Sequence, residues 1–149
     1  DFGDTTAIFA LPAVELGLTW TALKNIKYVN KFEAFANYTY LKRRNLDNPD
    51  VLFTGTPDSK IFFGLEYAPI KSASLTVSAE NNSEILANSK GTFKSPAFML
   101  ANLKATYSIA DFTIDAGVNN IADENYSLTE GYPEEGRNFF ANLTYKLMK

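Results

Sequence analysis

The stretch NNIADENYSLTEGYPEEGRNFFANLTYKL, residues 119–147, contains two successive patterns that decide the fold. Its first part is rich in Asn, Asp, Gly and Pro, which favour turns because they bond local backbone, accept positive φ or lack an amide donor. Its second part, residues 138–147, alternates apolar and polar positions, as a strand with two unlike faces does. This stretch therefore predicts a long polar loop followed by a strand.

The same alternation recurs upstream through most of the chain. No stretch has a helical period, and a weaker eighth segment with strand character covers residues 5–11. The sequence therefore predicts an all-β protein with about seven antiparallel strands, at 13–22, 31–41, 60–68, 74–81, 99–108, 112–120 and 138–147.

The predicted connections alternate in length. Those at 42–59, 82–98 and 121–137 are long and polar, whereas those at 23–30, 69–73 and 109–111 are shorter. In an up-and-down meander, every second connection lies at the same end of the sheet. All the long loops are therefore expected at one end, as in outer-membrane barrels.

Composition excludes several classes of function. The 149 residues include no Cys and no His, so disulfides, thiolate metal sites and Ser-His-Asp catalysis are impossible within this chain. A net charge of -3 argues against a nucleic-acid-binding surface. No run approaches the ~18 apolar residues of a membrane-spanning helix. We expect neither an enzyme nor a bound cofactor or metal.

Four elements near the end of the chain resemble the C-terminal end of TonB-dependent outer-membrane receptors. They are GVNNIADENY (117–126), GYP (131–133), GR (136–137) and NFFANLTYKL (138–147), with looser matches upstream. In that family the first element closes the next-to-last strand and opens the last extracellular loop, and the Gly-Arg pair starts the final strand. The matching residues are Asn119, Asn120, Asp123, Tyr126, Gly131, Tyr132, Pro133, Gly136 and Arg137.

The chemistry of these residues favours a structural role over ligand contact. Asn and Asp side chains can bond the backbone where a strand gives way to a loop, and Gly accepts backbone angles that other residues avoid. Pro133 has no amide donor and is expected in a loop. In the family, the final strand ends on an aromatic residue read by the barrel-assembly machinery. Here the corresponding apolar positions are Phe139, Leu143, Tyr145 and, last, Leu147.

The resemblance implies an antiparallel up-and-down transmembrane β-barrel. Family members form 22 strands around an N-terminal plug, so residues 1–149 would be the C-terminal seven or eight strands, without the plug. The implied function is outer-membrane uptake, in a Gram-negative bacterium, of a scarce bulky nutrient such as an iron–siderophore complex, cobalamin or haem. The implied partners are outer-membrane lipid, the plug and remaining strands, TonB through that plug, the barrel-assembly machinery and an extracellular metal chelate.

Two alternatives remain open at this stage. A complete eight-stranded outer-membrane barrel, acting as an adhesin or structural element, would pair residues 5–11 with 138–147. A soluble lipocalin-like binder would turn its apolar face inward, and GLTW (17–20) resembles the Gly-x-Trp start of lipocalins.

The sequence also predicts where two groups of charged residues lie. We expect loop carboxylates to be solvated rather than cation ligands, at Asp47, Asp50, Asp58, Glu130, Glu134 and Glu135. A second group falls on the polar strand faces, at Glu15, Glu33, Glu66, Glu80, Lys104, Asp115 and Lys146.

Overall fold

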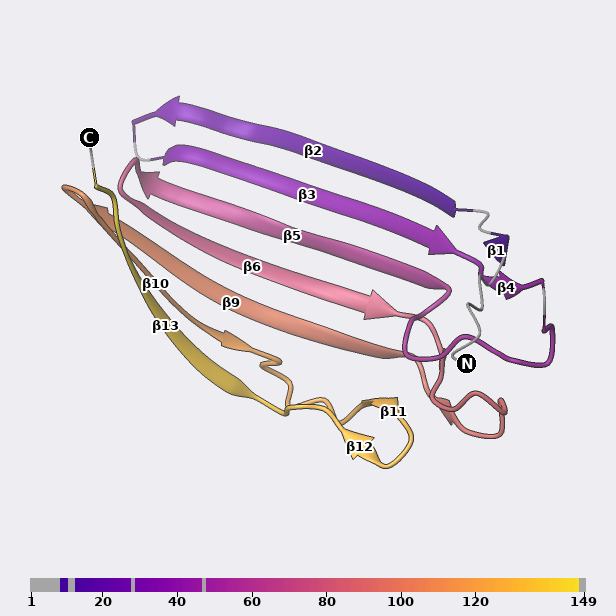
Figure 1. The fold of residues 1–149 in the computed structure, drawn as a ribbon. Coiled ribbons are helices and arrows are strands. Elements are labelled where there is room, and N and C mark those ends of the chain that lie inside the picture. The colour runs from indigo at the N-terminus through magenta and orange to yellow at the C-terminus, as the bar shows by residue number, and fades with distance from the viewer. Residues whose placement is uncertain (1–8, 11–12, 28, 47, 148–149) are drawn as a thin grey trace.

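The computed structural model describes all residues except 1–8, 11–12, 28, 47 and 148–149. Its main element is a curved sheet of seven long strands, β2 (Ala13–Ile26), β3 (Val29–Leu41), β5 (Ser59–Ile70), β6 (Ala73–Asn82), β9 (Phe98–Ile109), β10 (Phe112–Asn119) and β13 (Asn138–Tyr145) (Figure 1). The spatial order is β13-β10-β9-β6-β5-β3-β2, and every pairing is antiparallel. The described part of the chain holds no helix that could cross a membrane.

All seven predicted strands are present, which confirms the all-β prediction. The first runs four residues further than predicted because a bulge between Thr21 and Leu23 restores the alternation. The last strand ends at Tyr145 rather than at residue 147, so the prediction was too long there. The strand ends there because its partner β10 begins at Phe112, directly opposite Tyr145. Among the described residues, one further bond extends the pairing, from the Lys146 amide to the Asp111 carbonyl at 2.9 Å.

The connections alternate as predicted. The short connections that follow β2, β5 and β9 lie at one end of the sheet. The connections 42–58, 83–97 and 120–137 lie at the other end, which we call the loop end (Figure 1). These connections contain short strands of their own, β4 (Arg44–Asn45), β7 (Ile85–Leu86), β8 (Lys94–Ser95), β11 (Ser127–Thr129) and β12 (Tyr132–Pro133).

The predicted eighth strand at 5–11 is only partly described, since residues 5–8 and 11 lie outside the described residues. Its described part forms β1 (Phe9–Ala10), which pairs with β4 at the loop end. The pairing with 138–147 expected of an eight-stranded barrel is therefore not found in the described part. Instead, β13 and β2 form the two opposite edges of the sheet.

The sheet has one apolar and one polar face. Cross-strand partners share a face, so the register places Leu18, Ala36 and Phe63 side by side on the apolar face. That face is exposed: 71% of the surface of Leu18 is accessible. A soluble lipocalin-like fold would enclose this set, and the sheet does not. Further exposed members are Val14, Leu16, Trp20, Ile61, Leu65, Tyr67, Val77, Tyr107 and Ile114.

The buried apolar side chains gather mainly at the loop end. Ile85 is 1% exposed, and Ala87 and Phe98 are also buried. Of the buried apolar residues among those described, only Ala68 lies towards the turn end of a long strand. The loop end therefore has a small core of its own, while the sheet leaves its apolar face uncovered.

Candidate functional site

The residues of the predicted family motif meet where β10 leaves the sheet. Asn120 is 4% exposed and, like Asp123, has a positive φ, at 51° and 58°. The Asn120 side chain bonds both backbone groups of Glu124, accepting from its amide and donating to its carbonyl at 2.8 Å each. Asn102 on β9 accepts a bond from the Asn120 amide at 2.9 Å. Asn120 thus fixes the exit of the strand into the loop.

Asp123 joins the two ends of this connection. Its Oδ1 accepts a hydrogen bond from the Arg137 amide at 2.7 Å. A Cβ on Gly136 would lie 2.7 Å from the same oxygen, so a side chain at that position would displace the carboxylate. Beside them, Asn119 Nδ2 donates to Asn138 Oδ1 at 3.0 Å. We call the group Asn119, Asn120, Asp123, Gly136 and Arg137 the loop clamp.

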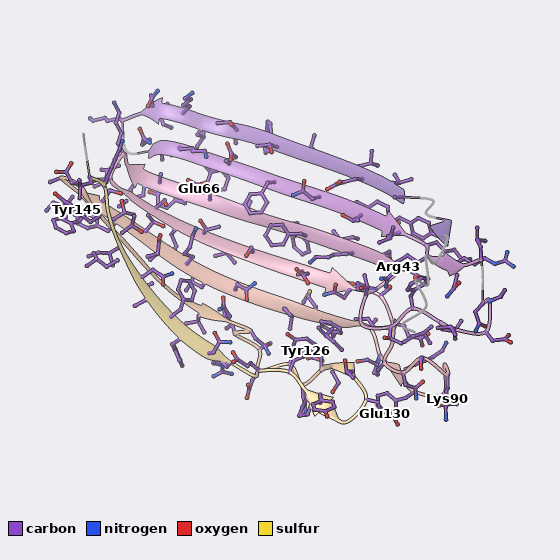
Figure 2. The ribbon with its side chains drawn as sticks, viewed as in Figure 1. Arg43, Glu66, Lys90, Tyr126, Glu130 and Tyr145 are labelled. Carbon is purple, nitrogen blue, oxygen red and sulfur yellow. The ribbon has the colours of Figure 1, made fainter. Side chains whose placement is uncertain are left out.

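The remaining motif residues lie further out in the same connection, and Tyr126 is one of them (Figure 2). Tyr126 stacks on Phe98, with ring centroids 4.4 Å apart, and burial raises the pKa of its hydroxyl, with a smaller contribution from Glu134. Gly131 has a φ of 81° in the turn between β11 and β12, and Tyr132 beside it is 72% exposed. Pro133 lies in this same connection, in the short strand β12 opposite Ser127. β11 and β12 form a two-stranded hairpin, in which both strands are edge strands. The missing backbone N–H of a proline is tolerated at such an edge.

The predicted C-terminal strand signal lies on the apolar face. Phe139 is 77% exposed, and Leu143 and Tyr145 follow it on the same face of the edge strand. Tyr145 packs against Phe112 of β10, with ring centroids 4.9 Å apart. Leu147 is exposed beyond the end of the strand, so the last apolar position inside β13 is the aromatic Tyr145.

Charges on the polar face are paired across strands, largely between residues predicted to lie there. Lys31 Nζ lies 3.0 Å from Glu33 and 3.2 Å from Glu66. Lys60 Nζ lies 2.6 Å from Glu80. The Lys31–Glu66 pair links β3 to β5 and the Lys60–Glu80 pair links β5 to β6, whereas the Lys31–Glu33 pair lies within β3.

Two glycines of the polar face lie beneath aromatic rings of neighbouring strands. A Cβ on Gly64 would come within 2.6 Å of the Phe35 ring, and one on Gly117 within 2.7 Å of the Phe140 ring. Each ring belongs to the residue directly opposite its glycine. The rings therefore lie flat along the sheet rather than projecting from it.

Hydrogen bonds join the three long connections into one body. The connection 83–97 is central, because its Leu86 carbonyl accepts from Gly55 at 3.0 Å and its Ala87 carbonyl accepts from Glu130 at 2.9 Å. Asn88 Nδ2 also donates to the Glu130 carboxylate at 2.7 Å. The loop end is therefore a preformed surface rather than three independent loops.

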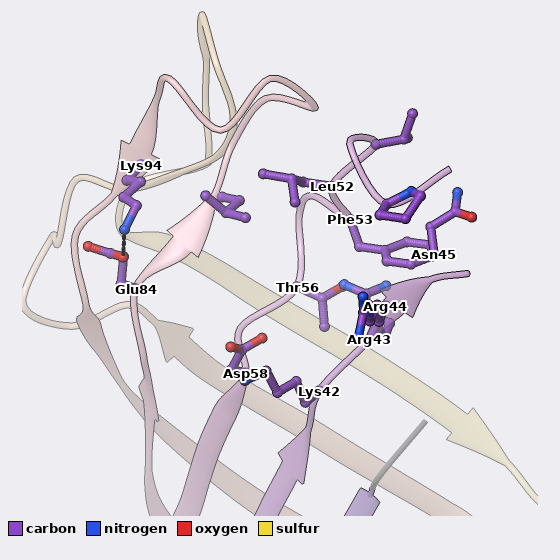
Figure 3. A pocket seen from close by; sticks show the side chains of 13 residues that line it. Lys42, Arg43, Arg44, Asn45, Leu52, Phe53, Thr56, Asp58, Glu84 and Lys94 are labelled. Carbon is purple, nitrogen blue, oxygen red and sulfur yellow. Dashed lines mark hydrogen bonds and ion pairs between the residues drawn. The ribbon is translucent and has the colours of Figure 1, made fainter. Parts of the chain in front are cut away.

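Two cavities lie at this end. One, of about 300 Å³, is mostly apolar and includes Ile85, Phe98 and Tyr126 in its lining. The other, of about 290 Å³, lies between the connection 42–58 and the β7–β8 hairpin (Figure 3). We call the second the basic pocket, because its charged lining residues are Lys42, Arg43, Arg44, Asp58, Glu84 and Lys94.

The basic pocket was not predicted from the sequence. The run LKRRN (41–45) was not singled out, and nothing in the sequence indicated that Lys94 would come to lie near it. Of the loop carboxylates expected to be solvated, Asp58 lines this pocket and Glu130 is bonded to Asn88, while Asp47 lies outside the described residues. Among the described residues, no three His, Cys, Asp or Glu side chains gather to hold a metal ion.

An antiparallel meander with an exposed apolar face and all long connections at one end is the architecture of a transmembrane β-barrel wall. Residues 14–121 match the family described as TonB dependent receptor-like, beta-barrel. The chain therefore belongs to the TonB-dependent receptor family, as the resemblance of its last thirty residues suggested. Members of this family are transporters, not enzymes. No curated protein sequence matches the chain.

Solved structures give the same fold. The copper transporter OprC matches with a TM-score of 0.69 and 19% identity, over 95% of this chain and 24% of its own. The siderophore receptor PiuA from Acinetobacter baumannii matches with a TM-score of 0.61 and 17% identity, over 91% and 21%. BauA, the ferric preacinetobactin receptor of the same organism, gives 0.51 and 16%, over 91% and 26%. The chain thus spans about a quarter of the length of these structures.

Proposed function

We propose that residues 1–149 are the C-terminal part of the barrel of an outer-membrane receptor that imports a scarce, bulky nutrient in a Gram-negative bacterium. The exposed apolar face of the seven-stranded sheet is the observation that carries the proposal. In water this face would drive aggregation, whereas in a bilayer it meets acyl chains and the strand ladder satisfies the backbone.

The two edges of the sheet indicate that further strands would pair with it. In this seven-stranded sheet β2 and β13 each pair on one side only, and unpaired edges are not tolerated in hydrocarbon. The remaining barrel strands of the same receptor would pair with these edges. The polar face would then line a lumen filled by an N-terminal plug, through which TonB supplies the energy for transport. The barrel-assembly machinery would insert the strands.

The ligand would be a metal chelate or a molecule of similar bulk, captured at the loop end. This assignment is supported by the structural likeness to proteins described as a copper transporter and as siderophore receptors. The joined connections 42–58, 83–97 and 120–137 would form part of the extracellular mouth. No residue of this segment needs to perform chemistry, because binding and passage make or break no covalent bond.

Uptake by cells tests the proposal directly. The complete gene is deleted and restored in its host, and cells are offered radiolabelled ferric siderophores, cobalamin, haem and copper one at a time. We expect the deletion to abolish uptake of one of them, and restoration to recover it only when TonB is present. Unchanged uptake of every compound, or a protein that fractionates with the soluble fraction, would contradict the proposal.

A further inference from the structure

The described lining residues of the basic pocket carry an excess of positive charge. Among the described residues, the lining has four cations and two carboxylates, a net charge of +2, in a chain whose net charge is -3. Glu84 is already bound, with its Oε1 2.6 Å from Lys94 Nζ. Within the described part of the chain, the side chains of Lys42 and Arg44 make no hydrogen bond or ion pair.

The walls of the pocket are fixed before anything binds. The Asn48 amide donates to Asn45 Oδ1 at 3.0 Å, which shapes the connection beside the cations. The Arg43 guanidinium lies over the Phe53 ring at 5.1 Å, which holds that side chain against the wall. The bond from Gly55 to the Leu86 carbonyl ties this wall to the opposite one. The backbone around the pocket would therefore need little rearrangement on binding, and the ordering cost would fall mainly on the Lys42 and Arg44 side chains.

We propose that the basic pocket binds an anionic group of the phosphate or carboxylate class, recognised by Lys42 and Arg44. Arginine presents a planar fork of donors that matches the paired oxygens of such groups, and lysine adds a point charge. The apolar lining next to these cations includes Val51, Leu52 and Leu86, so the anion would be attached to an apolar body. Figure 3 shows Leu52 and the labelled cations among the residues that line the pocket.

Two sources would supply this chemistry. One is the phosphate of a glycolipid in the outer leaflet of the membrane, and the other is a soluble anionic chelate. The inference rests on the proposed function in one respect, since that function places the loop end outside the cell. The experiment therefore examines barrel insertion separately from anion binding.

The test uses the receptor produced from its complete gene and purified in a non-ionic detergent. Isothermal titration calorimetry measures binding of inorganic pyrophosphate and of citrate to the receptor in plain micelles. A second arm measures binding to micelles containing lipid A, a bis-phosphorylated glycolipid, against micelles containing its dephosphorylated form. The test variant is Lys42→Gln with Arg44→Gln. The matched control, Lys71→Gln with Lys90→Gln, removes two charges elsewhere.

We expect the test variant to bind at least roughly tenfold more weakly than the wild type, and the control to bind like the wild type. The affinity of the wild type should also fall as salt is added. Binding of the soluble anions identifies a soluble source, and binding of phosphorylated lipid A alone identifies the membrane. The proposal is overturned if the wild type binds none of these probes, or if the test variant binds as tightly as the wild type.

Failure of the proposed function gives a different result. A receptor that does not fractionate with the outer membrane, and whose electrophoretic migration does not change on boiling, is not a membrane barrel whatever it binds. A receptor that passes both checks and binds no anion leaves the barrel assignment standing and removes the pocket assignment alone.

Discussion

The sheet and the loop end differ in where their apolar side chains lie: many are exposed on one face of the sheet, and several are buried at the loop end. On the sheet, large apolar side chains such as Leu16 and Leu65 stand exposed on one face, and no second layer covers them. At the loop end, Ile85, Ala87 and Phe98 are buried among the connections. The proposed barrel would cover the sheet with lipid and further strands, whereas the loop end is stabilised by its own contacts.

This difference matters for ligand capture. Loops are ordinarily the mobile part of a β-barrel, and ordering them on binding lowers affinity. Here backbone bonds connect three of them, and a small core lies beneath. In the proposed receptor, the mouth would therefore be organised before a ligand arrives, on a wall that would be completed only in the membrane.

The largest effect is expected in the core of the loop end. Ile85→Ala removes a fully buried side chain, which should cost about 2–5 kcal/mol because the cavity cannot fully collapse. Hydrogen exchange followed by mass spectrometry should show faster exchange across 83–97 and unchanged exchange in β6. Leu86→Ala, at the half-exposed neighbouring position, is the control and should change little. Equal effects of the two substitutions would mean that the loop end has no core of its own.

The next prediction concerns the exposed apolar face of the sheet, where a charged substitution should be destabilising. Val77→Arg places a charge among side chains that we assign to lipid, and should destabilise the barrel in lipid vesicles by about 2–4 kcal/mol. Thr76→Arg is the control, because Thr76 lies on the polar face opposite Glu66 and Lys104. Denaturant unfolding in vesicles measures both. A larger loss for Thr76→Arg would mean that the two faces have been assigned the wrong way round.

A smaller effect is expected where the two regions join. Asp123→Ala removes a charged acceptor from the Arg137 amide, and should cost about 1.5–3 kcal/mol locally. Asp123→Asn retains the oxygen acceptor and tolerates the positive φ, so it should lose much less. Exchange of the Arg137 amide, measured by NMR in micelles, separates the two variants. If both variants exchange like the wild type, the loop clamp does not hold the connection.

Sequence predicted the sheet well and the loop end poorly, for a physical reason. Alternation is a local property, so residues such as Leu18 and Phe63 reveal their face from their neighbours alone. The loop clamp was foreseen as a set of turn-forming residues, but the bond between Asp123 and Arg137 was not. The basic pocket joins Lys42 to Lys94 across more than fifty residues, and no local pattern encodes that contact. The extent of β13 was misjudged because its end is set by its partner β10.

The smallest effect is expected from the ion pairs of the polar face. The Lys60 and Glu80 side chains are partly exposed, and exposed pairs contribute at most about 1 kcal/mol. A double-mutant cycle with Lys60→Met and Glu80→Gln should therefore give a coupling energy below about 1 kcal/mol in 0.15 M salt, and less in 1 M salt. A coupling several times larger would show that the polar face is shielded from water. The plug would then have to be packed against β5 and β6, and the wall would take its stability from both of its faces rather than from lipid alone.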